Sequence, residues 1–127
     1  MSSITDSLEI LLDRCQTLQT EVAQQVKEFS CVEMDDLEGV KRINTILTPL
    51  EIDIKTIELQ LKRLKINLKE SEQYMVFKTV KAKDEQVVLD TFDINEALLG
   101  LKRVRNKLRD HRDYLLYSIE LKIKERD

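Results

Sequence analysis

The only histidine of the chain, His111, is the first residue to consider for catalysis or metal binding. It lies in the run Arg109-Asp110-His111-Arg112-Asp113, where a carboxylate could orient an imidazole that acts as a general base or as a metal ligand. Consecutive residues of a helix point in different directions, so Asp110 is poorly placed to hold this ring. A single histidine without a Glu-x-x-His motif cannot form the di-iron site of a helical bundle. We therefore expect no catalytic residue, no metal and no cofactor.

The cysteines and glycines supply no other recognisable chemistry. Cys15 and Cys31 form no Cys-x-x-Cys motif, and two cysteines are too few for a disulfide framework. Cys15 falls on an apolar helical stripe, where a free thiol behaves as a small hydrophobic side chain. Gly39 and Gly100 are isolated, which excludes a glycine-rich phosphate-binding loop. These observations predict a protein that is not an enzyme.

Four basic residues form one helical stripe. Lys102, Arg105, Arg109 and Arg112 follow a spacing of three, four and three residues. Such a stripe could bind phosphates of nucleic acid or an anionic membrane surface, or it could pair with the acidic first helix or with an acidic partner subunit. Aromatic residues that would stack on single-stranded bases are missing from it. We expect a secondary charged contact with protein, with binding of nucleic acid or of an anionic membrane surface as the alternative function.

Apolar residues occur on two opposite sides of the segment 47–68. One side has the spacing of a coiled-coil or bundle seam and comprises Leu47, Leu50, Ile54, Ile57, Leu61, Leu64 and Leu68. The other side repeats every seven residues and comprises Ile52, Leu59 and Ile66. A helix with one buried side would carry charged residues on this second side.

The second apolar side has two interpretations. In the first, the segment is the central helix of a layered arrangement, and the first and last helices of the same chain cover its two sides. In the second, Ile52, Leu59 and Ile66 form an interface for another chain. Full burial of each such side chain is worth about 1.5–3 kcal/mol, which is large beside the net stability of a domain, about 5–15 kcal/mol. We favour the partner interface.

Capping residues place the first and last helices. Ser3 with Asp6 three residues later can cap a helix over about 4–29. Asp93 begins the same arrangement, which predicts a last helix over about 94–124.

The sequence around Pro49 indicates a boundary in the middle of the chain. Thr48–Glu51 combines a capping threonine, a proline at the first helical position and a glutamate at the third. It predicts a short helix over 36–47 and a long one over 49–74. Because the apolar register continues through the proline, a kinked continuous helix is the alternative.

Residues 75–93 show no clear helical period. Two β-prone runs, 74–80 and 86–92, are joined by a connector without glycine or asparagine, so a hairpin is disfavoured. We expect the frayed end of a helix, a loop and a short helical turn, in a segment that becomes ordered on a partner.

Composition and charge agree with a single helical domain. The 127 residues include 35% charged and 5% aromatic residues, two glycines and one proline, which is typical of long helices. The net charge of −3 argues against a general affinity for nucleic acid. Residues 1–39 hold nine acids against two bases, whereas residues 61–83 hold seven bases against two acids. These segments should attract each other in an antiparallel arrangement.

The sequence lacks the signals of export. No basic region followed by an apolar run stands at the N-terminus, and no long uncharged apolar window is present. We expect a soluble, intracellular protein, cytoplasmic or nuclear.

Together these features predict an all-α protein, an elongated antiparallel helical bundle or coiled coil of three long helices and a short one. We expect a non-enzymatic structural or adaptor subunit of a larger complex. Its partners would be proteins, in a hetero-oligomer or a homodimer, bound through Ile52, Leu59 and Ile66.

Overall fold

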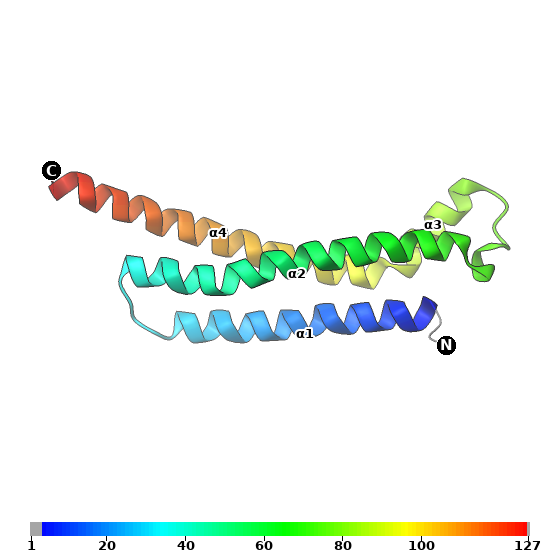
Figure 1. The fold of residues 1–127 in the computed structure, drawn as a ribbon, viewed down its shortest axis with the longest axis horizontal. Coiled ribbons are helices and arrows are strands. Elements are labelled where there is room, and N and C mark those ends of the chain that lie inside the picture. Colours follow the sequence, from blue (N-terminus) through cyan, green and yellow to red (C-terminus); the bar gives the residue numbers. More distant parts are fainter. Residues whose placement is uncertain (1–3, 127) are drawn as a thin grey trace.

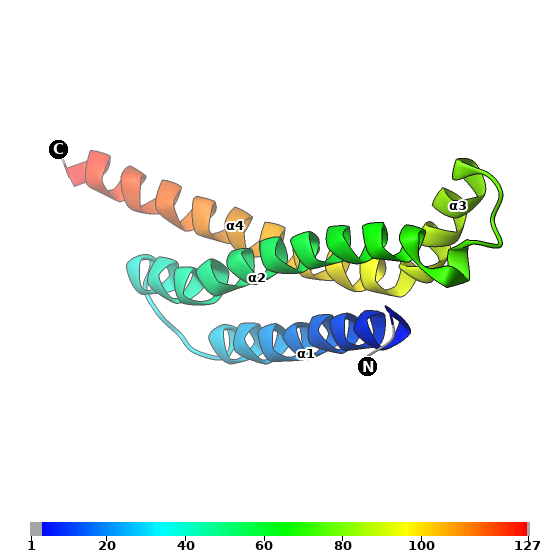
Figure 2. The same cartoon turned by 45° about the vertical axis from the view of Figure 1, so that its right-hand side comes forward.

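Three long helices lie side by side in the computed structural model, which describes residues 4–126 (Figure 1). The elements in chain order are α1 (Ile4–Ser30), α2 (Asp36–Glu70), the 3-10 helix η1 (Glu72–Tyr74), α3 (Val80–Asp90) and α4 (Phe92–Arg126). α2 runs antiparallel to both α1 and α4 (Figures 1 and 2). The predicted all-α antiparallel bundle is therefore confirmed. The cap predicted at Ser3 lies outside the described residues.

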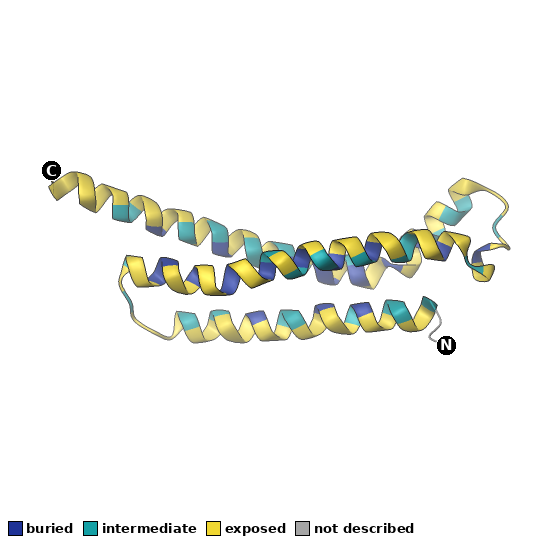
Figure 3. Cartoon of the chain, in the orientation of Figure 1, coloured by how far each residue is buried: buried dark blue, intermediate teal, exposed yellow. Residues whose placement is uncertain are grey.

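The predicted seam of α2 is the centre of the core. Leu50, Ile54, Ile57 and Leu61 are almost fully buried, and Leu64 is half-buried. The side chains packed around them come from α1 (Leu11, Cys15, Val22) and from α4 (Ile94, Leu98, Leu101, Leu108, Leu115). In Figure 3 the buried positions of α1 lie on its side toward the other helices. The three-and-four spacing thus fixes which side of each helix faces inward.

A glycine allows α1 and α4 to meet closely. The side chain of Gln19 on α1 donates from Nε2 to the carbonyl oxygen of Ala97 on α4, at 2.8 Å. A Cβ atom at Gly100 would lie 2.6 Å from the same Nε2 atom. The absence of a side chain at Gly100 therefore leaves room for this hydrogen bond between the parallel helices.

α2 runs through Pro49 without a break, so the predicted boundary between helices 36–47 and 49–74 is wrong and the alternative, one continuous helix, is confirmed. A proline inside a helix removes one backbone hydrogen bond and clashes with the preceding turn, which costs about 3 kcal/mol. Leu47 and Leu50, on either side of it, are both buried in the same core, and each contributes about 1.5–3 kcal/mol. Packing in one register offsets the proline, and the ribbon of α2 is bent rather than straight (Figure 1).

The continuous helix makes a testable prediction about Pro49. We expect Pro49→Ala to raise the free energy of unfolding by about 1–3 kcal/mol in chemical denaturation, because alanine restores the hydrogen bond. Thr48→Ala is the control and should change it by less than about 0.5 kcal/mol. A loss of about 1 kcal/mol for Thr48→Ala, with no gain for Pro49→Ala, would instead mean that a new helix begins at Pro49 in solution.

Residues 80–90 form α3, so the prediction of irregular structure over 75–93 is wrong for this part. Thr79 caps the helix, its Oγ1 accepting the backbone N–H of Ala82 at 3.1 Å. The β-prone runs 74–80 and 86–92 form no strand within the described residues, and most of the second run lies inside α3. The cap at Thr79 and packing against α2 stabilise a helix over residues 80–90 although the local sequence favours a β-strand.

Tyr74 anchors this end of the molecule. Its ring is buried in a small second core with Leu68 and Val87, and its hydroxyl donates to Oδ2 of Asp90 at 2.5 Å. Burial, and then the Asp90 carboxylate, raise the pKa of Tyr74 far above its ordinary value. The phenol therefore stays a hydrogen-bond donor that links η1 to the end of α3.

The helix ends near α3 also differ from the predicted ones. α2 ends at Glu70 rather than 74, because the N–H and the hydroxyl of Ser71 both bond the Leu68 carbonyl, at 3.1 and 2.6 Å. α4 begins at Phe92 rather than 94, directly after the buried Thr91. Ser71 thus marks the end of α2 and Thr91 marks the start of α4, where the sequence predicted a start after Asp93.

The C-terminal part of α4 extends beyond the ends of α1 and α2 (Figures 1 and 2). Before it separates, it is tied to the start of α2 by Asp36, whose Oδ2 accepts from Ser118 Oγ and Lys122 Nζ, each at 2.8 Å. Close packing is possible there because a Cβ at Gly39 would lie only 2.9 Å from Cδ1 of Leu115. These contacts define where α4 leaves the bundle.

The contact at Asp36 predicts a shifted titration. Hydrogen bonds from Lys122 and Ser118 lower the pKa of Asp36 below its ordinary value of 3.8. Because the folded pKa is below the unfolded one, the stabilisation is complete above the unfolded pKa and is lost as the pH falls through the lowered value. We expect an NMR titration of the Asp36 carboxyl below 3.8 in the wild type, and a return toward 3.8 in Lys122→Met. An ordinary titration in the wild type would show that the contact does not persist in solution.

Candidate partner-binding surface

Ile52, Leu59 and Ile66 form an exposed apolar line along α2, which we call the outer stripe. Their exposed fractions are 61%, 50% and 51%, although the core around the opposite seam is closed. α1 and α4 both pack on the seam side of α2. The arrangement in which helices of the same chain cover both sides is therefore wrong, and the outer stripe is uncovered.

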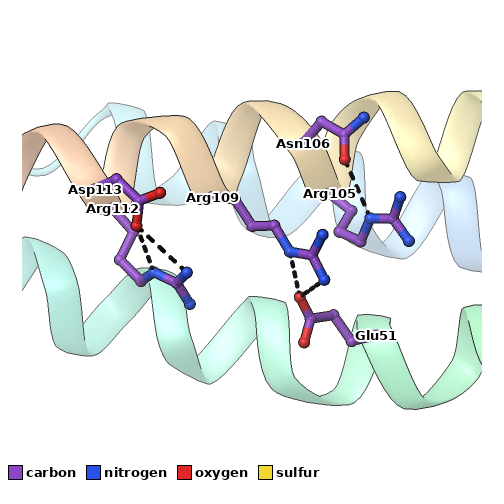
Figure 4. A network of polar contacts seen from close by, with 6 residues as sticks. All are labelled: Glu51, Arg105, Asn106, Arg109, Arg112 and Asp113. Carbon is purple, nitrogen blue, oxygen red and sulfur yellow. Dashed lines mark hydrogen bonds and ion pairs between the residues drawn. The ribbon is translucent and has the colours of Figure 1, made fainter.

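Polar contacts on both edges of the seam fix the rotation of α2, so that the outer stripe faces away from α1 and α4. On the edge toward α4, Glu51 accepts from Arg109 at 2.6 Å (Figure 4), and Glu58 lies 3.5 Å from Lys102 Nζ. On the edge toward α1, Asp53 lies 3.9 Å from Arg14. The two flanks of the seam are thus each assigned to one neighbouring helix, and the side between them faces away from the bundle.

The predicted basic stripe divides its contacts between α2 and its own helix, α4. Two of its members pair across the helices, Lys102 with Glu58 and Arg109 with Glu51. The other two contact neighbours on α4, Arg105 bonding Asn106 at 3.2 Å and Arg112 bonding Asp113 at 3.4 Å (Figure 4).

The acidic partners of these bases were missed in the sequence. The basic stripe lies on α4, which is parallel to α1, and its ion pairs go to α2 and to Asp113 of α4 itself (Figure 1). The acidic segment 1–39 and the basic segment 61–83, for which the charges predicted an antiparallel arrangement, do run antiparallel where they form α1 and the end of α2. The partners of Lys102 and Arg109 are instead acids of α2, which lie beside its seam. Glu51 and Glu58 directly follow the seam residues Leu50 and Ile57 in sequence. Positions beside a seam face the neighbouring helix, and this could have predicted the two ion pairs.

The side chains with potential for catalysis are not brought together. His111 is exposed, and its ring meets Phe29 edge-on with 5.8 Å between ring centroids. Cys15 is fully buried, and desolvation raises the pKa of its thiol in spite of nearby Arg14. Cys31 is a free, exposed cysteine. Among residues 4–126, no group of three or more His, Cys, Asp or Glu side chains is arranged to hold a metal ion.

A shallow hollow lies between α1 and α2, beside the outer stripe. It has a volume of about 310 Å³ and includes the apolar side chains of Ile10, Leu11 and Leu64. Arg14 and Arg63 also line it, and Ile10 is 65% exposed. Arg63 follows Leu59 by one helical turn, so the hollow borders the outer stripe.

Two further apolar surfaces, at the ends of the bundle, were not predicted as exposed. One lies on α3 and the adjoining segments, and includes Met75, Val76, Val80, Val88, Leu89 and Phe92. The other lies on the extended end of α4, and includes Tyr114, Leu116, Tyr117, Leu121 and Ile123. Leu115, which lies between Tyr114 and Leu116, is buried against Gly39 of α2, so its exposed neighbours lie on the sides of α4 that face away from the bundle.

No family model, curated protein sequence or solved structure significantly matches this chain. None of the helices within residues 4–126 has the length and apolar character needed to cross a membrane.

Exposure of the outer stripe predicts little effect of polar substitutions on folding. We expect Ile52→Glu, Leu59→Glu and Ile66→Glu each to change the free energy of unfolding by less than about 1 kcal/mol in urea denaturation. Ile54→Ala, on the buried seam, should cost about 2–5 kcal/mol. A comparable loss at Leu59 would place the outer stripe in the chain's own core.

Proposed function

We propose that this chain is a non-enzymatic structural or adaptor subunit, which joins a larger intracellular assembly by coiled-coil or helix-bundle packing. The observation that carries the proposal is the outer stripe: three large apolar side chains, seven residues apart, on a helix whose other side already closes a core. Apolar side chains repeated every seven residues are typical of a helix side that packs on a second helix.

The energetics favour an interface that is larger than the outer stripe alone. Covering three half-exposed side chains gains about half of their full burial energy, roughly 2–5 kcal/mol. A complex with a micromolar dissociation constant requires about 8 kcal/mol. The partner must therefore also contact neighbouring groups, and the apolar surfaces at the two ends of the bundle are available for further subunits.

Binding of phosphates through the basic stripe has less support. Lys102 and Arg109 already pair with Glu58 and Glu51, and Arg112 lies 3.4 Å from Asp113, so three of the four positive charges are balanced within the chain. An intracellular setting agrees with the two cysteines, both of which are free thiols.

The size of the native particle tests the proposal. In an extract of cells that naturally express the chain, we expect gel filtration to place it in a particle much larger than its own 14.9 kDa. The triple variant Ile52/Leu59/Ile66→Glu should lose most of this association, because each new carboxylate would have to be buried in the interface.

A matched variant controls for the added charge. Gln16, Thr17 and Ala23 are exposed residues of α1, and their replacement by Glu changes the charge equally. That variant should stay in the large particle. If the wild type elutes as a free monomer, or if both variants behave alike, the outer stripe is not the assembly surface.

A further inference from the structure

We infer that the outer stripe binds an amphipathic helix whose apolar seam is flanked by aspartate and glutamate. This inference rests on the proposed function and specifies the partner of the same surface. It is carried by the charges that border Ile52, Leu59 and Ile66 and by the hollow beside them.

Basic side chains follow the outer stripe along its length. Each stripe residue has a lysine three positions later, and these three exposed lysines are Lys55, Lys62 and Lys69. Residues three apart are neighbours on a helix surface, so the lysines form a row along one border. Arg63 lies on the other border, between Leu59 and Ile66 in sequence.

Most of these charges are unsatisfied by the chain itself. Lys69 pairs with Asp84 at 2.6 Å, but Lys55, Lys62 and Arg63 form no ion pair with any residue in the range 4–126. Glu51 and Glu58, which lie beside the lysine row, are taken up by α4. Glu70, four residues after Ile66, adds one negative charge at the end of the border that holds Arg63, so bases still outnumber acids around the outer stripe. The border of the outer stripe is therefore positive, and it complements acidic residues on either side of a partner's seam.

The hollow between α1 and α2 supplies a pocket for a side chain of that partner. Ile10, Leu11 and Leu64 offer apolar surface, and Arg63 offers positive charge, whereas Arg14 is already paired with Asp53. A helix lying along the outer stripe could place a large apolar residue into this hollow and an acidic residue against Arg63. This combination of apolar and basic lining matches the same acidic amphipathic helix.

A second copy of the chain fits this surface poorly. Two antiparallel α2 helices could align their outer stripes about Leu59, but the lysine rows would then approach each other, and like charges oppose association. α1 of another copy carries acids, yet in its described part Ile10 is the only large apolar side chain that is exposed. One such residue cannot cover a stripe of three.

The shape of the surface favours a helix over a lipid bilayer. Helices that lie on membranes bury a broad apolar face. Here the apolar face is one residue wide, because Thr56 and Arg63 occupy its other border. A repeat of seven residues is instead the period at which two packed helices meet.

Two synthetic helical peptides test the inference. Both carry the same leucine seam at heptad spacing, and their flanking positions are all Glu in one and all Lys in the other. By fluorescence anisotropy in about 0.1 M salt, we expect the wild-type chain to bind the Glu peptide at least about tenfold more tightly. The preference should shrink at higher salt.

Variants assign the preference to the surface. Lys55/Lys62/Arg63→Glu should reverse it, whereas Arg103/Lys107/Lys124→Glu, the same charge change at exposed positions of α4, should preserve it. Ile52/Leu59/Ile66→Gln should weaken the binding of the Glu peptide at least about tenfold without changing the charge.

Other results would overturn the inference. The wild-type chain could bind both peptides equally and lose both in the Gln variant. The outer stripe would then still be an assembly surface, but its partner would not need acidic residues. No binding of either peptide up to about 0.1 mM also overturns it. A wild-type dimer in sedimentation, lost in the Gln variant, identifies a second copy as the occupant, and binding to phosphatidylserine vesicles identifies a membrane. In each case, the particle size in cell extract reports separately on the proposed function.

Discussion

Burial of the seam of α2 between α1 and α4 is the interaction on which the rest of the structure depends. Ile54 and Ile57, at the middle of this seam, are fully buried. Because the seam has a single register, it holds α2 as one helix through Pro49, and it places both neighbours on the same side. The outer stripe is exposed as a direct consequence. A helix that packs in this way has one side left for another molecule.

The charged residues orient this packing more than they stabilise it. Exposed ion pairs contribute about 0–1 kcal/mol each, so Glu51 with Arg109 and Glu58 with Lys102 add little to stability. Their effect is to assign one edge of α2 to α4, as Asp53 with Arg14 assigns the other edge to α1. The bases that stay unpaired then border the outer stripe. Charge selects the neighbours inside the bundle and leaves a positive border outside it.

Sequence-based prediction was accurate where apolar periods are long and inaccurate where local signals compete with packing. The amphipathic character of α1, α2 and α4 and the buried seam were predicted correctly. The helix start predicted at Pro49 does not occur, because buried side chains on both sides of the proline pack into one core. Only a short helical turn was predicted where α3 forms, because the local β-propensity hides the cap at Thr79 and the packing of Val87 against Leu68 and Tyr74. The residues of the outer stripe were identified, and their exposure agrees with the favoured interpretation, in which the chain itself does not cover them. That they bind a partner stays a prediction.

The sequence by itself determined that α2 has two apolar sides, since the period of a helix is a local property of the chain. It also placed a basic stripe on α4. Only the tertiary structure decided that the seam is buried and that Ile52, Leu59 and Ile66 are not, because burial depends on where α1 and α4 pack. It likewise decided that Lys102 and Arg109 are satisfied within the chain, whereas Lys55, Lys62 and Arg63 are not so paired within residues 4–126. Such pairings join residues far apart in sequence, and no local pattern specifies them.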